Sequence, residues 1–212
     1  MAKEIKLNTH KWSKITLAFD FAAREHQYQL RKSTHIPYIS HLMSVSALIL
    51  ENGGDEDQAI AGLLHDVIED AEPSSRIPFI RNEISRLFGS KVSEIVENCT
   101  DGLPDLNGLK PPWKPRKERY LSSLESKSND TLLVSCCDKL HNARSILTDL
   151  KTVGGSVFDR FSATQDETIW YYESLSKLFL NKLQNKNGEI AARELKDTVK
   201  EIKRVFKNSK KL

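Results

Sequence analysis

Ionisable side chains interrupt apolar runs of this chain that otherwise have the character of buried helix. His65 and Asp66 directly follow the apolar run 59–64, and Asp138 directly follows the apolar run 132–137. Burying a charge costs free energy unless the charge is paired or bound to a metal ion. Imidazole and carboxylate groups that converge from separate helices are typical ligands of a divalent metal. The sequence therefore favours a helical fold that brings these side chains together around a cation.

Helices are predicted for nearly the whole chain. Apolar residues recur with helical spacing, and glycine and proline are sparse, at 9 and 7 of 212 residues. Asp55, with Gln58 three residues later, has the capping-box pattern that starts a helix. We predict an all-α fold with helices over 11–30, 38–51, 56–72, 79–88, 92–99, 116–124, 131–150, 158–183 and 189–206.

Residues 100–115 form the least regular segment. They contain Gly102, Pro104, Asn107 and Gly108 and three further prolines. A loop of this length inside a compact domain is usually functional or mobile. The sequence leaves open whether this loop closes over a substrate.

The charge distribution gives little support for a nucleic-acid or membrane partner. The net charge is only +3, and the basic excess gathers in 196–211, where Phe206 is the one aromatic residue. A solvated helix face explains such a run better than a binding patch, which would interleave aromatic residues for stacking. The chain has no apolar run long enough to span a membrane and no signal-peptide pattern. We therefore expect a cytoplasmic protein, whose oligomeric state the sequence does not set.

The three cysteines do not form a recognisable framework. Cys99, Cys136 and Cys137 are odd in number, which suits a reducing compartment, and they lack the C-x-x-C spacing of a zinc site. We interpret them as small buried residues.

A cluster of acids follows the apolar run of the third predicted helix. His65, Asp66, Glu69 and Asp70 stand at positions i, i+1, i+4 and i+5, so that His65 is expected over Glu69 and Asp66 over Asp70. Without a cation these acids would repel one another. The alternative is a solvated acidic helix end, but apolar residues are interleaved with the acids. We therefore favour a site in which the later acids orient a metal-bound water or accept its proton.

A second polar stripe begins at Asp138. Asn142 and Ser145 recur on its helical face, and Arg144 lies beside them, which suits a phosphorylated substrate. His141 is interpreted as a packed, hydrogen-bonded core residue. The spacing alone gives little support for His41 as a ligand.

Three fragments together resemble a known family. Residues 37–41 (PYISH), 62–70 (GLLHDVIED) and 138–145 (DKLHNARS) are similar to the HD-type metal phosphohydrolases. Among these they most resemble the hydrolase domain of RelA/SpoT-type alarmone enzymes and the small alarmone hydrolases. The resemblance implies an HD-domain helical bundle, with 1–212 as a single domain, a metal core over 22–183 and a basic helix and tail over 189–212.

The resemblance also implies roles for individual residues. The ligands of one Mn²⁺, or of another divalent ion, would be His41, His65, Asp66 and Asp138. The pair that positions and deprotonates the attacking water would be Glu69 and Asp70. The side chains that bind the nucleotide would be Arg31, Lys32, Tyr38, Asn142, Arg144 and Ser145.

The implied reaction is hydrolysis of the 3′-pyrophosphate of ppGpp or pppGpp, or of an adenosine equivalent. The loop 31–38 is one residue longer than the usual family pattern and lacks its Gly and Glu, so the choice between guanine and adenine stays open. One alternative is another HD-type nucleotide phosphohydrolase, such as a nucleotidase or a deoxynucleotide triphosphohydrolase. An alternative of a different class is a non-catalytic nucleotide-sensing module.

Overall fold

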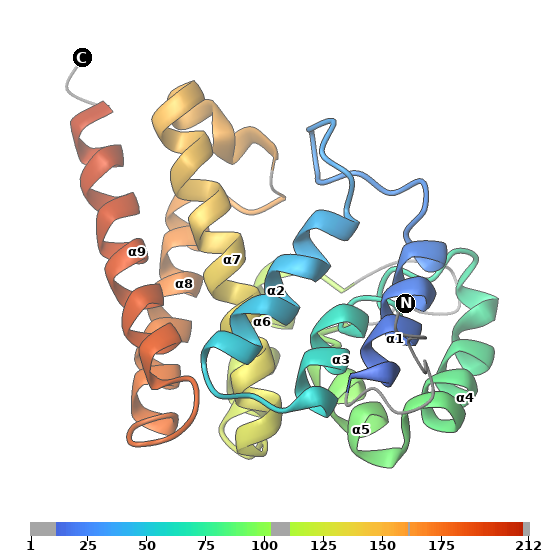
Figure 1. The fold of residues 1–212 in the computed structure, drawn as a ribbon. Coiled ribbons are helices and arrows are strands. Elements are labelled where there is room, and N and C mark those ends of the chain that lie inside the picture. Colours follow the sequence, from blue (N-terminus) through green and yellow to red (C-terminus); the bar gives the residue numbers. More distant parts are fainter. Residues whose placement is uncertain (1–11, 103–110, 161, 210–212) are drawn as a thin grey trace, which may run out of the picture.

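Helices account for the regular structure throughout the described residues, which are 12–102, 111–160 and 162–209 of a computed structural model (Figure 1). In that part of the chain the one extended contact is an isolated antiparallel bridge between Leu30 and Pro37. The predicted all-α class is therefore confirmed. The helices are α1 (Ser13–Glu25), α2 (Ile39–Glu51), α3 (Glu56–Leu64), the 3₁₀ turn η2 (Ser74–Arg76), α4 (Ile77–Phe88), α5 (Ser90–Cys99), α6 (Trp113–Leu124), α7 (Asn129–Val153), the 3₁₀ segment η3 (Gly154–Arg160), α8 (Gln165–Lys182) and α9 (Glu189–Ser209).

The long helix α7 is the central element. It packs against α2, α3 and α5 on one side and against α8 and α9 on the other, which is the left side in Figure 1. Its segment 131–138 is buried on every face, including the thiols of Cys136 and Cys137. These two thiols are free and belong to the hydrophobic core, as predicted. Asp138 is therefore carried into the interior by a helix that has no polar face at this point.

The helix α3 brings the second set of polar residues to the same place. It begins with the predicted capping box, in which Asp55 and Gln58 each accept a hydrogen bond from the other's backbone N–H. Its residues 58–64 are all buried against α1, α2, α5 and α7. The helix therefore ends in the interior, directly before His65.

The prediction that this helix continues to residue 72 is wrong. The regular helix ends at Leu64, and residues 65–70 form turns. Isolated backbone hydrogen bonds remain, from the Val67 N–H to the Leu64 carbonyl at 3.1 Å and from the Asp70 N–H to the Asp66 carbonyl at 2.9 Å, but they do not repeat as they do in a helix. In these turns Oδ2 of Asp66 lies 3.0 Å from Nε2 of His65. The turn also lets the His65 ring bond back to the carbonyl of Gly62, 2.8 Å away.

Other boundaries differ for local reasons. The first predicted helix ends earlier, at Glu25, and its residue 11 lies outside the described residues. The helix predicted over 158–183 starts at Gln165, because Thr164 and Glu167 form a capping box there. In the irregular segment predicted over 100–115, residues 103–110 lie outside the described residues, and α6 already begins at Trp113.

The last helix, α9, closes one side of the core. Ala192, Leu195, Val199 and Ile202 are buried, and the helix packs on α7 and α8. Of the helices in the described part of the chain, none combines the length and apolar character needed to cross a bilayer.

Gly188 joins this last helix to the core. Its φ is +90°, and its N–H donates a hydrogen bond to the carbonyl of Asn52, 3.1 Å away. A Cβ added here would lie 2.8 Å from Cδ1 of Leu133 on α7. Gly89 has nearly the same φ, +92°, but a Cβ there would meet nothing within 4 Å. Alanine substitutions at the two glycines therefore separate the cost of backbone strain, which both share, from the cost of crowding Leu133, which only Gly188 has.

We predict that Gly188→Ala destabilises the protein more than Gly89→Ala does. The positive φ should cost each variant about 1–3 kcal/mol of unfolding free energy. The contact with Leu133 should add about 1–3 kcal/mol to the cost of Gly188→Ala alone. Denaturant unfolding followed by circular dichroism measures both. Equal losses in the two variants would show that α9 does not need close packing at this point.

Candidate metal centre

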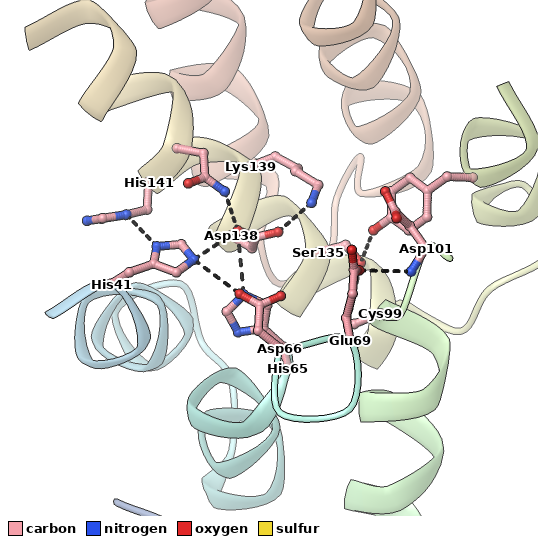
Figure 2. Close-up of polar contacts among 12 residues, drawn as sticks. His41, His65, Asp66, Glu69, Cys99, Asp101, Ser135, Asp138, Lys139 and His141 are labelled. Carbon is pink, nitrogen blue, oxygen red and sulfur yellow. Dashed lines mark hydrogen bonds and ion pairs between the residues drawn. The ribbon is translucent and has the colours of Figure 1, made fainter. Parts of the chain in front are cut away.

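Three buried side chains from separate parts of the chain meet at one point. His41 comes from α2, His65 from the turn after α3, and Asp138 from α7 (Figure 2). The Asp138 Oδ1 atom lies 3.2 Å from Nε2 of His41 and 3.6 Å from Nε2 of His65. One potential ligand atom from each residue lies within 4.8 Å of the others. This buried cluster is a candidate divalent-metal site.

Asp66 lies at the edge of this cluster. Its Oδ2 atom is 3.0 Å from Nε2 of His65 and 3.9 Å from Nε2 of His41. Its side chain is 21% exposed, compared with 7% for that of Asp138. The structure thus brings together all four residues that the resemblance implied as ligands.

The two imidazoles present the right atoms for a metal. Nε2 of His41 and Nε2 of His65 are buried and have no hydrogen-bond partner in the described structure. The opposite nitrogen of His65, Nδ1, faces the carbonyl of Gly62, which can only accept a hydrogen bond, so Nδ1 carries the proton. In the neutral ring Nε2 then points its lone pair at the carboxylates. A buried lone pair beside two carboxylates fits a divalent cation well.

The electrostatics of the cluster also indicate a cation. Burial alone would raise the pKa of Asp138, but Lys139 and His65 outweigh burial and hold that pKa well below its usual range. Burial likewise would lower the pKa of His65, but Asp66 and Asp138 outweigh it and raise that pKa well above its usual value. A proton on His65 can therefore balance the two carboxylates. A divalent cation would do so more completely, because it attracts both carboxylates and uses both imidazole lone pairs.

Hydrogen bonds from outside hold each carboxylate in place. The Tyr38 hydroxyl donates to Oδ2 of Asp66 at 2.6 Å. Asp138 accepts from the Asn142 amide at 2.5 Å and from the Lys139 ammonium at 2.6 Å. Partners of this kind orient metal ligands and tune their basicity. Tyr38 and Asn142 were predicted as substrate contacts, and the structure shows that both also touch the acids of the cluster.

His141 contacts the cluster directly. Its Nδ1 atom lies 2.7 Å from Nδ1 of His41, so one ring must donate and the other must accept (Figure 2). Burial, with His41 nearby, lowers the pKa of His141 to about 4, which keeps the ring neutral and able to accept. His41 can then donate from Nδ1 and present the Nε2 lone pair to a metal. The packed, hydrogen-bonded interpretation of His141 was thus incomplete, because its partner is a site residue.

A polar pocket of about 150 Å³ opens beside the cluster. Its lining combines acids, bases and the ligand carboxylates, and consists of Tyr38, Asp66, Glu69, Asp70, Cys99, Asp101, Lys117, Asp138, Lys139 and Asn142. A pocket that places ammonium groups beside a candidate metal site suits a phosphorylated ligand.

Glu69 and Asp70 diverge within this pocket. Glu69 turns toward the segment after α5, where its Oε2 atom is 3.4 Å from the Asp101 N–H and Arg116 is 3.6 Å from Oε1. Asp70 accepts a hydrogen bond from the Gln29 amide at 2.8 Å. The predicted stacking of His65 over Glu69 is therefore corrected, because His65 faces Asp66 and Asp138 instead. The turn at residues 65–70 is the reason.

Two lysines that line the pocket, Lys117 and Lys139, were not predicted as site residues from the sequence. Lys117 pairs with the buried carboxylate of Asp101, which also accepts from Arg116 at 2.5 Å. Burial would lower the pKa of Lys139, but Asp138 outweighs burial and raises it well above its usual value, so Lys139 is charged. Lys139 had a detectable signal, since it is a second charge inside the apolar helix. Lys117 had none, because only the tertiary fold brings α6 to the pocket.

The remaining predicted substrate residues differ in their contacts and in their distance from the pocket. Arg31 donates to the Asn142 carbonyl oxygen at 2.7 Å, and Lys32 beside it is exposed. Arg144 pairs with Glu194 of α9, and the Ser145 hydroxyl donates to a backbone carbonyl at 3.0 Å. Neither Arg144 nor Ser145 lines the pocket, so their contact with substrate stays a prediction.

Comparisons with known proteins agree with this geometry. Residues 18–168 match the family model described as "HD domain". The chain is 34% identical over 134 residues to the human protein named guanosine-3′,5′-bis(diphosphate) 3′-pyrophosphohydrolase MESH1, covering 61% of this chain and 67% of that one. It is equally identical to a probable guanosine-3′,5′-bis(diphosphate) 3′-pyrophosphohydrolase of Synechocystis, but covers 62% of this chain and only 16% of that longer protein.

Solved structures give the same picture. The structure described as "A metazoan ortholog of SpoT hydrolyzes ppGpp and plays a role in starvation responses" has a TM-score of 0.65 at 26% identity, covering 92% of this chain and 97% of that one. A structure from Listeria monocytogenes, at 23% identity and a TM-score of 0.60, covers 79% of this chain and 99% of that one and shares the fold. The predicted resemblance to alarmone hydrolases is confirmed.

We predict that divalent metal stabilises the protein through His65. Metal at about 100 times its dissociation constant should add about 2.7 kcal/mol to the unfolding free energy. His65→Ala should lose this gain, whereas His35→Ala, at an exposed position, should keep it. Thermal unfolding with and without Mn²⁺, Mg²⁺ or Zn²⁺ measures the difference. A gain that survives His65→Ala would place the metal elsewhere.

We also predict that His141 supports metal binding through His41. His141→Leu removes the acceptor and should weaken metal affinity about 10- to 100-fold. His141→Gln offers an amide oxygen in its place and should retain more of that affinity. Calorimetric titration of metal into each variant tests this. Wild-type affinity in His141→Leu would contradict the contact's importance.

Proposed function

The chain belongs to the HD-domain family, and on this basis we propose that it is a metal-dependent 3′-pyrophosphohydrolase of alarmone nucleotides. The substrates would be ppGpp and pppGpp or their adenosine equivalents, and the products pyrophosphate and the nucleotide with a free 3′-hydroxyl. The observation that carries this proposal is the pocket that Lys117 and Lys139 line together with Asp66 and Asp138 of the His–Asp cluster. The names of the human and Synechocystis relatives support the choice of substrate.

The proposed metal is a single Mn²⁺, held by His41, His65, Asp66 and Asp138. When bound, it would lower the pKa of a water molecule and polarise the phosphoryl group attached to O3′. The hydrogen bonds from Tyr38 and Lys139 would keep the two carboxylates pointed at the ion.

The acids of the pocket would handle the water. Glu69 and Asp70 line the same pocket as Asp66 and follow it by three and four residues in the sequence. We propose that they orient the attacking water and accept its proton, which is a role carboxylates fill when they are held in place. The hydrogen bond from Gln29 to Asp70 and the ion pair from Arg116 to Glu69 support such a fixed geometry.

The basic groups would hold the phosphates. Lys117 and Lys139 are positioned to offset the charge of the pyrophosphate group inside the pocket. Arg31 donates a hydrogen bond to the side chain of Asn142, which lines the pocket, and its neighbour Lys32 is exposed, so this pair would bind the rest of the nucleotide. The same region would choose between guanine and adenine.

We also propose that the chain is a single domain and that it works in the cytoplasm. One hydrophobic cluster includes residues of every α-helix, α9 among them, which supports a single domain over 1–212. Free cysteines in the core suit a reducing cytoplasm. A small-molecule nucleotide is the proposed partner, and the absence of nucleic acid and membrane partners stays a prediction.

We predict that the protein with Mn²⁺ releases pyrophosphate from ppGpp, pppGpp or ppApp and leaves GTP and dGTP intact. Chromatography of the products with a pyrophosphate assay measures this. Phosphate or triphosphate release from ordinary nucleotides would favour another HD-type phosphohydrolase. Binding of ppGpp without any turnover would favour a sensing module.

We further predict that two variants separate metal binding from water activation. Asp138→Ala should lose both bound metal and turnover, because it removes a buried ligand. Glu69→Gln should keep the metal while its kcat falls about 10²- to 10⁴-fold. Glu118→Gln, at an exposed position on α6, is the matched control and should behave as wild type. Full activity in Asp138→Ala would show that the ligand set is wrong.

A further inference from the structure

A side-chain amide next to the cluster holds one of the two water-handling acids. Gln29 lies in the segment between α1 and α2 and reaches across to the turn after α3. Its Nε2 atom is 2.8 Å from Oδ2 of Asp70, and its Oε1 atom is 2.5 Å from Nδ1 of His26. The amide thus bridges a buried imidazole and a carboxylate of the pocket.

The direction of these hydrogen bonds follows from the chemistry of the groups. An ionised carboxylate can only accept, so Asp70 must face the NH₂ end of the amide. The amide oxygen then faces His26, whose Nδ1 must carry the proton. Burial lowers the pKa of His26, so the ring is neutral. His26 is 4% exposed, which leaves little freedom for the chain of three groups to rearrange.

The backbone places Gln29 next to Tyr38. The Tyr38 N–H donates to the Gln29 carbonyl at 2.9 Å, and the Arg31 N–H donates to the Ile36 carbonyl at 2.8 Å, so the loop between them is closed at its base. The Tyr38 hydroxyl bonds to Asp66 at 2.6 Å. The two ends of one loop therefore each hold one acid of the turn at residues 65–70.

Ring stacking ties these two ends together. The His26 and Tyr38 rings lie with centroids 5.2 Å apart and planes inclined by 25°. The ring that fixes the Gln29 amide is thus packed on the ring whose hydroxyl fixes Asp66.

We propose that Gln29 is a positioning residue, which orients the Asp70 carboxylate toward the attacking water while His26 holds the amide. The hydrogen bond from the Gln29 amide to Oδ2 of Asp70 prevents free rotation of the carboxylate, so the other carboxylate oxygen keeps a constant direction. This inference deepens the proposed function and rests on it for the role of Asp70. It adds that the loop that carries Arg31 and Lys32 also sets the geometry of the acids.

The test compares Gln29→Met with Gln27→Met in the full chain. Methionine is close to glutamine in size but donates no hydrogen bond, and Gln27 is exposed in the same segment. We expect kcat of Gln29→Met for 3′-pyrophosphorylated nucleotide to fall about 10- to 100-fold. KM, metal affinity and the melting temperature should stay close to those of wild type, because Gln29 touches neither the metal ligands nor the phosphate-binding lysines.

A readout independent of turnover is the side-chain amide signal of Gln29 in the ¹⁵N NMR spectrum with Mg²⁺, assigned by its loss in Gln29→Met. This signal should exchange slowly with solvent and should move in Asp70→Ala, whereas the Gln27 signal should do neither.

Three results would overturn the proposal. The first is a wild-type kcat in Gln29→Met, and the second is a loss of kcat matched by an equal loss of metal affinity or of melting temperature. The third is a Gln29 amide signal whose position does not change in Asp70→Ala. If the wild-type protein hydrolyses none of the nucleotides, the proposed function fails instead. The NMR result then decides alone whether Gln29 holds Asp70.

Discussion

The burial of the Asp138 carboxylate is the constraint on which the rest of the structure depends. The residue is 5% exposed on a helix that is otherwise apolar at this point. An uncompensated charge there would cost several kcal/mol, as an order of magnitude. Its compensation comes from His41, His65 and Lys139, which belong to three different stretches of the chain. The packing of α2, α3 and α7 is therefore tied to the site, because α2, the turn after α3 and α7 each carry one of the groups that stabilise this carboxylate.

A second organising element is the loop between α1 and α2. It covers residues 26–38 and has no regular structure beyond turns and the bridge between Leu30 and Pro37. Nevertheless its side chains reach the acids of the site, through Tyr38 to Asp66 and through Arg31 and Asn142 to Asp138. A loop that both meets the substrate and holds the acids would couple recognition to catalytic geometry.

The sequence predicted the helices well where local signals were strong. The capping box at Asp55 set the start of α3, and the apolar run before Asp138 set the buried part of α7. The prediction was wrong at the end of α3, because helical periodicity continued through residues 65–70 whereas the backbone forms turns there. The gathering of the acids was foreseen, but the pairing of His65 with Glu69 was not what formed.

The sequence by itself determined the all-α class and the expected convergence of His65, Asp66 and Asp138, because helical periodicity and the cost of isolated buried charge can be read from neighbouring residues. His41 was added to this set by the family resemblance of the three motifs. Only the tertiary structure decided which side chains form hydrogen bonds with these site residues and line the pocket. His141 meets His41, Gln29 meets Asp70, and Lys117 enters the pocket, across sequence separations that carry no local signal. The physical reason is that hydrogen-bond geometry depends on how helices pack, and packing is settled by the whole core rather than by any one segment.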